Sequence, residues 1–409
     1  MAKNHLIGLL LSTEEDWPSA FEALIREFSP TISYGGEDHT FSTERITYEP
    51  FDLRAVPRHS IVIERLSHWY SLPREWLKKI ALMNDVYLLN NPFTFQAMEK
   101  HAAYCALLRL GLKVPETWMI PHRLPPEDER FPETSRRYNL PFDLREVAEK
   151  IGYPLFMKPF DGGAWVGVTK VSNPEELMAR YAESGPRLMH LQKAVDFDVF
   201  ARSLSIGAET MVVRFEPDRP MFDRYQVSHG FLEPQIGAEV VTIGRLVNAY
   251  FRWEFNSCET LVADSEVSPI DYANASPDLA ITSLHYYFPW AIRTLAKWCI
   301  FCTVTGRRMR LHQDVARYNE LADRPDLTYK DKLAGYRDLT EEYFETERYE
   351  EFCAEYLPEI DEAMVRFISS PAFDAILVEA VTATFPPHEH ERFIAHYRGL
   401  LGAWVMDQH

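Results

Sequence analysis

The sequence predicts an α/β protein with a helical C-terminal region, and three observations support this prediction. Residues 1–90 alternate apolar, strand-like runs with amphipathic helical segments, which is typical of a small open α/β layer. Residues 151–171 contain two short apolar segments around a glycine-bearing turn, and this pattern predicts a strand, a loop and a second strand. Residues 291–409 carry apolar side chains at helical spacing, which predicts a helical extension.

Length, charge and composition limit the classes of protein to consider. A chain of 409 residues is too long for one ordinary core and predicts two to four domains. The net charge is −18, with 43 Lys and Arg against 61 Asp and Glu. This charge disfavours nucleic acid and anionic membranes as partners, because both require a cationic face. The apolar run at residues 5–11 is too short for a signal peptide or a membrane span, so a cytoplasmic protein is expected.

The five cysteines do not suggest a disulfide framework, because their number is odd and their spacing is irregular. Cys299 and Cys302 form a C-x-x-C motif inside an apolar helical segment. A redox or metal role would need a second ligand pair, and the sequence offers none. We therefore interpret both residues as thiols of the core.

The first 120 residues contain regular strand and helix patterns. Strands are predicted at residues 6–11, 46–53, 60–63, 86–89 and 112–120, and helices at 17–28, 73–83 and 95–110. Glu64, Arg65 and His68 follow one of these strands, so they either face a ligand crevice or lie in a solvated loop. Residues 121–141 are rich in proline and charge and predict a mobile loop, which a short helix at 143–150 follows.

The stretch at residues 151–171 has the residue types of a phosphate-binding loop. Gly162, Gly163 and Gly167 leave backbone N–H groups uncovered, and such groups can bond phosphate oxygens. Lys158 supplies a point charge beside them. Taken alone, the stretch favours an ordinary hairpin with a surface lysine.

The wider pattern resembles the nucleotide-binding core of ATP-grasp enzymes. Its main part is G-Y-P, apolar residues and then K-P-x-x-G-G-x-x-x-G-V, and related segments follow in the expected order from about Leu6 to about Asp278. The resemblance implies an ATP-grasp α+β fold in four parts. These are an N-terminal open α/β domain (1–90), two subdomains that sandwich ATP (91–190 and 191–290), and a helical C-terminal extension outside the usual core (291–409).

The same resemblance assigns nucleotide contacts to individual residues. Lys100 and Lys158 would contact ATP phosphates, under a loop that contains Gly162, Gly163 and Gly167. The hinge, whose backbone reads the adenine edge, is matched by Gln192, Lys193 and Val195, and the ribose ligand by Asp198. The other interpretation of Lys100 is a solvated helix lysine, and its context favours phosphate contact.

Two predicted antiparallel strands, 250–262 and 267–278, carry the residues that the resemblance assigns to Mg²⁺. The family places an acid on one strand and an acid–x–Asn on the next, and Mg²⁺ prefers such hard oxygen ligands. The matching residues here are Glu259, Asp271 and Asn274. Asp271 and Asn274 are one residue further apart than usual, and a β-bulge near Ala273 would reconcile the spacing. Glu254 and Asn256 are the second choice of metal ligands. Burying polar groups among apolar residues is costly unless they have partners, so a purely structural role for these polar residues is the weaker interpretation.

The resemblance implies an ADP-forming ligase that uses ATP and Mg²⁺ to couple a carboxylate to an amine. Arg252 or Arg214 is the expected stabiliser of the oxyanion, although Arg202 and Arg214 could equally form strand-edge salt bridges. The alternatives are a kinase and a non-catalytic ATP-binding protein. The complete set of lysines and acids argues against the latter. Homodimers are common among related enzymes, and the sequence leaves the oligomeric state open.

Overall fold

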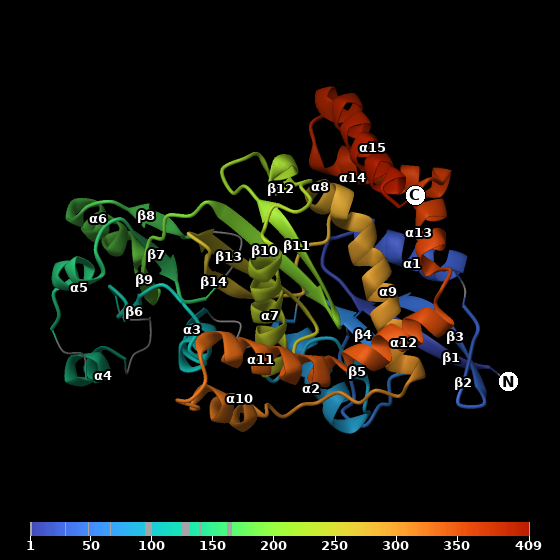
Figure 1. Ribbon diagram of the computed structural model, residues 1–409, viewed down its shortest axis with the longest axis horizontal. Helices are drawn as coiled ribbons and strands as arrows, with labels where there is room; N and C mark the ends of the chain where they lie inside the picture. Colours follow the sequence, from blue (N-terminus) through green and yellow to red (C-terminus); the bar gives the residue numbers. More distant parts are fainter. Residues whose placement is uncertain are drawn as a thin grey trace.

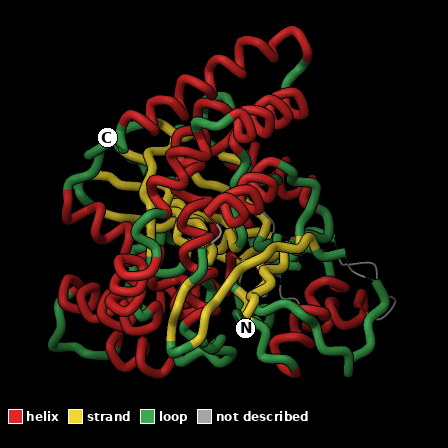
Figure 2. Tube along the Cα trace, turned by 90° about the vertical axis from the view of Figure 1, so that its right-hand side faces the viewer, coloured by secondary structure: helices red, strands yellow, loops and turns green. Residues whose placement is uncertain are grey.

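The structure is a computed structural model that describes residues 2–28, 30–47, 49–65, 67–94, 100–124, 131–138, 141–161 and 166–408. These residues form three β-sheets with helices packed around them (Figure 1). Figure 2 shows the same arrangement from the side, with strands toward the middle and helices around them. The predicted α/β class and the helical C-terminal region are both confirmed.

The N-terminal sheet is open and largely parallel. Its order is β2-β3-β1-β4-β5, with β1 Lys3–Leu10, β2 Ile32–Tyr34, β3 Glu37–Arg45, β4 Ile61–Glu64 and β5 Tyr87–Leu88. Helix α1 (Asp16–Phe28) packs on one face, and α2 (Ser71–Met83) packs on the other with Leu10 and Val62. The strand predicted at residues 46–53 is wrong. Strand β3 ends at Arg45, and the described residues of 46–53 are not in a strand. Pro50 lies in that predicted segment and cannot donate to a β-ladder.

A second, four-stranded sheet is antiparallel and has its own small core. Its order is β6-β9-β7-β8, with β6 Thr117–Ile120, β7 Leu155–Pro159, β8 Thr169–Val171 and β9 Met189–Lys193. Helices α5 (Leu144–Ile151) and α6 (Pro174–Ser184) contribute to this small core, whereas α3 (Lys100–Arg109) belongs to the main core and contacts β14 (Glu266–Ala275) of the third sheet. Helix α4 (Phe131–Tyr138) follows β6 along the chain. Helix α4 lies within the predicted loop at 121–141, of which 125–130 and 139–140 are outside the described residues. The expected boundary between residues 190 and 191 falls inside β9, which pairs with β6 and β7 throughout.

The third sheet, which we call the central sheet, is antiparallel and carries helix α7 on one face (Figure 1). Its order is β12-β11-β10-β13-β14, with β10 Val199–Ile206, β11 Glu209–Phe215, β12 Tyr225–Gln226, β13 Phe255–Ala263 and β14 Glu266–Ala275. Helix α7 (Pro234–Phe251) is unbroken, because Pro234 is at its first turn, where no N–H bond is lost. A Cβ at Gly244 would lie 2.8 Å from Ser203 Oγ, so the glycine lets α7 lie directly on β10. The other face of the sheet is left for the candidate site.

The C-terminal extension packs into the main core. Its helices are α8 Ile281–Leu284, α9 Phe288–Val304, α10 Val315–Ala322, α11 Tyr329–Phe344, α12 Thr346–Tyr356, α13 Ile360–Ile368, α14 Pro371–Thr384 and α15 His390–Met406. Helices α9, α13 and α14 contact α1, and α11 contacts α7. Helical spacing of apolar residues predicts one helix over 349–369, but the structure has two, α12 and α13, because Pro358 interrupts the segment. None of these helices, nor any other in the described residues, is long and apolar enough to cross a bilayer.

The N-terminal sheet, the central sheet and the helical extension meet at one buried carboxylate, Glu254, which is 3% exposed. Tyr87 Oη donates to both carboxylate oxygens, at 2.8 and 2.7 Å. Trp298 Nε1 donates at 2.8 Å, Arg307 Nη2 at 3.0 Å and Tyr343 Oη at 3.3 Å. Four donors therefore surround this carboxylate, with the single Tyr87 hydroxyl hydrogen shared between its two oxygens, so both oxygens are already occupied by the protein. The second-choice assignment of Glu254 as a metal ligand is therefore wrong. Its hydrogen-bond partners come from segments that are distant in the sequence, so spacing along the chain does not reveal them.

Asn256, the other second-choice ligand, also has a structural role. Its Nδ2 donates to Asn248 Oδ1 on α7 at 2.9 Å and to the Tyr272 carbonyl at 2.9 Å. Its Oδ1 accepts the Asn274 backbone N–H at 2.9 Å. The side chain is 1% exposed and faces α7, so it cannot share a metal with residues on the opposite face of the sheet.

The two cysteines of the C-x-x-C motif are buried in α9 as free thiols. Burial raises the pKa of both thiols far above the ordinary value, which opposes thiolate chemistry. We expect Cys299→Ala to leave nucleotide turnover unchanged in a steady-state ADP-release assay. A large loss of turnover in a folded variant would instead support a redox or metal role for this motif.

Candidate active site

The candidate site lies where the four-stranded sheet meets the central sheet. Lys100, the first residue of α3, places its Nζ 2.6 Å from Asp271 Oδ2 on β14. Lys158 on β7 places its Nζ 3.4 Å from the Ile270 carbonyl. Both lysines are buried, with 6% and 7% of their surface exposed. Two lysines predicted from separate motifs thus lie beside the same acidic strand.

The predicted bulge in β14 is confirmed. Ser257 pairs with Asn274 and Glu259 pairs with Asp271, so two steps along β13 match three steps along β14. The extra residue falls at Tyr272 or Ala273. Side chains three residues apart on a regular strand face opposite sides, and one extra residue returns them to the same side. The bulge therefore places Asp271 and Asn274 on one face together with Glu259.

These residues form a polar row across three strands, on the face opposite α7. Arg202 on β10 is directly paired with Glu259, and their charged groups are 4.0 Å apart. Ser257 Oγ accepts from Arg202 Nη2 at 3.2 Å and from Asn274 Nδ2 at 2.8 Å. The Asn274 amide oxygen has no hydrogen bond within the described chain, so it remains available to a ligand.

The donor set fits Mg²⁺ better than a transition metal. Across the parts of the chain that the structure describes, no three His, Cys, Asp or Glu side chains gather as a metal site. Two carboxylates and one amide oxygen suit Mg²⁺, which takes few protein ligands and completes its coordination with phosphate oxygens and water. Glu259, Asp271 and Asn274 could hold Mg²⁺ in this way once a nucleotide is present.

Burial and charge shift the ionisation of this cluster. Burial lowers the pKa of Lys158 to about 8, although the Asp271 carboxylate acts in the opposite direction. Burial also opposes the charge on Lys100, but the bond to Asp271 outweighs it and raises the pKa of this lysine. Burial raises the pKa of Glu259 despite the nearby Arg202. Buried lysines at such a junction can form charge-assisted hydrogen bonds with the oxygens of a polyanion.

The expected hinge segment adjoins this cluster, at the end of β9. Gln192 is buried and donates from Nε2 to Thr117 Oγ1 at 2.7 Å, and the Lys193 backbone N–H donates to the Glu116 carbonyl at 2.9 Å. The Val195 backbone N–H has no partner among the described residues. Asp198 is exposed beside the β13–β14 turn, where its Oδ2 accepts from the Asp264 N–H at 3.3 Å.

The glycine loop is only partly described. Gly162 and Gly163 lie outside the described residues. Gly167 has a φ of +77°, and a Cβ there would lie 3.0 Å from the Pro159 ring. A glycine is therefore required where this loop returns toward β7.

The two arginines predicted to stabilise an oxyanion lie elsewhere. Arg214 pairs with Ala201 and not with Arg202, so it lies on the α7 face of the sheet, where Nε donates to Glu216. Arg252 directly follows α7 and precedes β13. The part of β13 from Phe255 to Glu259 spans about 13 Å, so Arg252 is separated from the candidate metal ligand Glu259 by that length of strand. These predictions fail because strand alternation and the end of α7 direct both side chains away from the acids.

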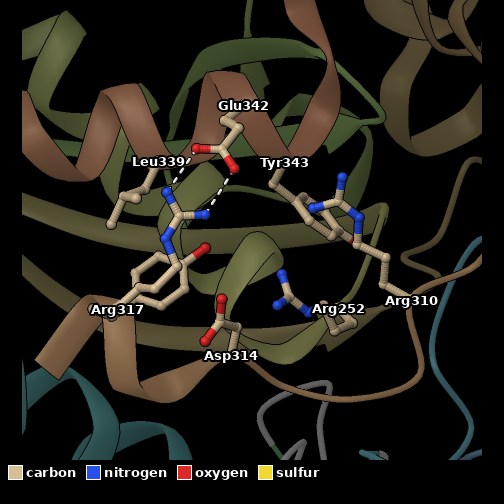
Figure 3. Close-up of a pocket in the computed structure, with 8 residues that line it drawn as sticks. Arg252, Arg310, Asp314, Arg317, Leu339, Glu342 and Tyr343 are labelled. Atoms are coloured by element: carbon tan, nitrogen blue, oxygen red, sulfur yellow. Dashed lines mark hydrogen bonds and ion pairs between the residues drawn. The ribbon is translucent and has the colours of Figure 1, made fainter.

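Arg252 contacts its own helix α7 and the helical extension. Its guanidinium donates to the carbonyls of His312 and Ala249, both at 3.0 Å. Figure 3 shows Arg252 beside Asp314 and Tyr343, with Arg310 on the far side of the tyrosine. The guanidinium carbon is 4.9 Å from the centre of the Tyr343 ring. This arginine therefore attaches α7 to α11 and is distant from the lysine and acid cluster.

Sequence reasoning missed Tyr104 and left Arg202 undecided. Tyr104 Oη donates to the Ile270 carbonyl at 2.9 Å, and its ring centre is 5.4 Å from Lys158 Nζ. Nothing in the sequence separates this residue from other apolar positions of the helix. Arg202 is the arginine that lies beside the candidate metal ligands, and only its pairing with Glu259 across the sheet reveals this.

The end of β4 also lies near the end of β14. Glu64 Oε1 accepts from Ser276 Oγ at 2.9 Å, and Arg65 donates to the Ser276 carbonyl. Glu64 is 2% exposed, which excludes the solvated-loop interpretation for this residue. The carboxyl edge of the N-terminal sheet thus adjoins the strand that carries Asp271 and Asn274.

Comparison with solved structures shows the fold. No protein-family model matches the sequence, and no curated protein is similar to it in sequence. The structure is similar to a RimK-domain ATP-grasp protein from Sphaerobacter thermophilus, with a TM-score of 0.50 and 12% identity over 72% of this chain and 98% of that chain. A D-alanine–D-alanine ligase from Bacillus anthracis, complexed with ATP, has a TM-score of 0.49 and 11% identity over 75% and 100% of the two chains. The similarity to the RimK-domain protein shows that this chain has the ATP-grasp fold.

Proposed function

We propose that this protein is an ADP-forming ATP-grasp ligase that activates a carboxylate with ATP and couples it to an amine. One observation carries the proposal. The buried lysines Lys100 and Lys158 lie beside the part of β14 that carries Asp271 and Asn274, next to Glu259, at the junction of two sheets. This arrangement supplies cations for a triphosphate and oxygen ligands for Mg²⁺ side by side.

Nucleotide binding would rearrange the contacts of Lys100. In the structure, this lysine forms an ion pair with Asp271 at 2.6 Å. The phosphates of ATP would compete with Asp271 for the lysine and so free the carboxylate to bind Mg²⁺ with Glu259 and Asn274. Bound Mg²⁺ would supply charge neutralisation at the β- and γ-phosphates.

The proposed reaction has two steps. An oxygen of the substrate carboxylate attacks the γ-phosphorus of ATP, and the bond between that phosphorus and the oxygen bridging it to the β-phosphate breaks. The products of this step are an acyl phosphate and ADP. The amine then attacks the acyl carbon, inorganic phosphate leaves, and the amine loses a proton. Arg202 lies beside Glu259 and is placed to stabilise negative charge in either step, the role that Arg252 and Arg214 cannot take.

Trapping of the acyl phosphate tests this proposal. Purified protein would be incubated with ATP, Mg²⁺ and a panel of carboxylates, with and without amines, while ADP is measured. Hydroxylamine added to the mixture should yield a hydroxamate, since it attacks an acyl phosphate as an amine does. Carboxylate-dependent ADP release with hydroxamate is the expected result. ADP release that depends on a hydroxyl compound and gives no hydroxamate would contradict the ligase and identify a kinase.

A further inference from the structure

A cleft of about 570 Å³ opens at the amino ends of β1, β4 and β5, against the end of α9. Small-molecule sites typically measure about 300–1,000 Å³. The candidate active site adjoins the carboxyl ends of the same sheet, where Glu64 contacts Ser276. The eight residues of β1 separate these two edges by about 23 Å. The cleft is therefore distinct from the nucleotide cluster.

The rim of the cleft carries positive charge that the protein does not neutralise. Lys3 and Arg308 both line it and are exposed, and neither side chain has an ion pair or hydrogen bond within the described residues. Asp85 is the one carboxylate in the described lining. In a chain of net charge −18, an excess of cations around a concave site is a local exception that favours an anion.

Two histidines in the walls have hydrogen-bonding capacity left over. His5 Nε2 is 2.8 Å from His39 Nδ1, and His59 Nε2 is 2.9 Å from Glu44 Oε2. The Nδ1 atoms of His5 and His59 are buried and have no hydrogen-bond partner in the described structure. Buried polar atoms without partners are uncommon in proteins, and each one calls for an explanation such as a missing ligand or water.

We propose that this cleft is a second ligand site, which binds a small organic anion with its acidic group between Lys3 and Arg308 and its polar body against His5 and His59. The floor of the cleft connects this site to the interior. Tyr87 and Arg307 line the cleft and also donate hydrogen bonds to Glu254. A ligand there would bind only the folded protein and so raise its unfolding temperature.

Citrate, a small polyanion, is a suitable probe. We expect saturable binding of citrate by calorimetry, together with an increase in the thermal unfolding midpoint. The double variant Lys3→Ala/Arg308→Ala should weaken binding by about 10-fold or more, because it removes both unpaired cations. Arg310→Ala is the matched control, since Arg310 lies on the same segment but stacks on Tyr343 outside the cleft lining.

Lys158→Met separates this site from the nucleotide site. Citrate binding should be unchanged in that variant and in Arg310→Ala. Loss of binding in Lys158→Met would place citrate in the nucleotide cluster and overturn the proposal. Equal losses in Arg310→Ala and in the double variant would show non-specific charge attraction and overturn it as well. The absence of saturable binding up to about 10 mM citrate would have the same consequence.

Discussion

Replacing Glu254 with leucine is expected to lower the free energy of unfolding by about 3–5 kcal/mol, the usual cost of removing one partner of a buried ion pair. The change would leave the Arg307 side chain, 2% exposed, with Glu345 at 3.3 Å as its one charged partner among the described residues. It would also leave the hydroxyl of Tyr87 and the indole N–H of Trp298 without their acceptor. Each of these losses carries the penalty of a buried, unsatisfied polar group.

Urea denaturation followed by circular dichroism measures this effect. Glu342→Leu is the matched control, because Glu342 pairs with Arg317 on the surface, where both side chains are about half exposed. An exposed pair of this kind contributes about 1 kcal/mol or less. Equal destabilisation by the two substitutions would show that the Glu254 cluster does not hold the three parts of the protein together.

Asp271→Asn is expected to reduce the rate of ADP formation by about 100-fold or more, equal to about 2.7 kcal/mol of transition-state stabilisation. Asparagine has the shape of aspartate and still accepts a bond from Lys100, so the fold is expected to persist. The amide lacks the charge that a Mg²⁺ ligand contributes beside the phosphates. Steady-state ADP release with saturating ATP measures the change, after circular dichroism has established that the variant is folded.

Asp326→Asn provides the control for this substitution. Asp326 is an exposed acid that pairs with Arg324 in the helical extension, far in sequence from the candidate site. The rate of ADP formation should be unchanged in this variant. An Asp271→Asn protein with the full wild-type rate would remove Asp271 from the set of metal ligands.

The parts of the site that depend on local spacing could be predicted from the sequence. The bulge in β14 followed from the extra residue between Asp271 and Asn274, and strand pairing shows it where expected. The position of Lys158 followed from a short apolar run, a proline and a glycine loop, which together determine a strand and its end. Register and turn chemistry act over a few residues, so a sequence displays them directly.

The parts that depend on distant contacts could not be predicted. Glu254 has the residue type and spacing of a metal ligand, but its partners lie 167, 44 and 89 residues away, at Tyr87, Trp298 and Tyr343. The neighbours of Arg214 in the sequence point to the face of the central sheet opposite α7. Only the pairing of β10 with β11 shows that Arg214 itself lies on the α7 face. The role of a buried polar residue is decided by the elements that pack over it.

Calorimetric titration with a non-hydrolysable ATP analogue tests the central claim most directly. We expect magnesium-dependent binding in the wild-type protein, and a loss of about 100-fold or more in Lys158→Met, which removes a buried cation from the cluster. Lys113→Met, a change at an exposed lysine that pairs with Glu266, should bind as the wild type does. No binding at millimolar analogue, or binding that Lys158→Met leaves intact, would contradict a nucleotide site at the junction of the two sheets.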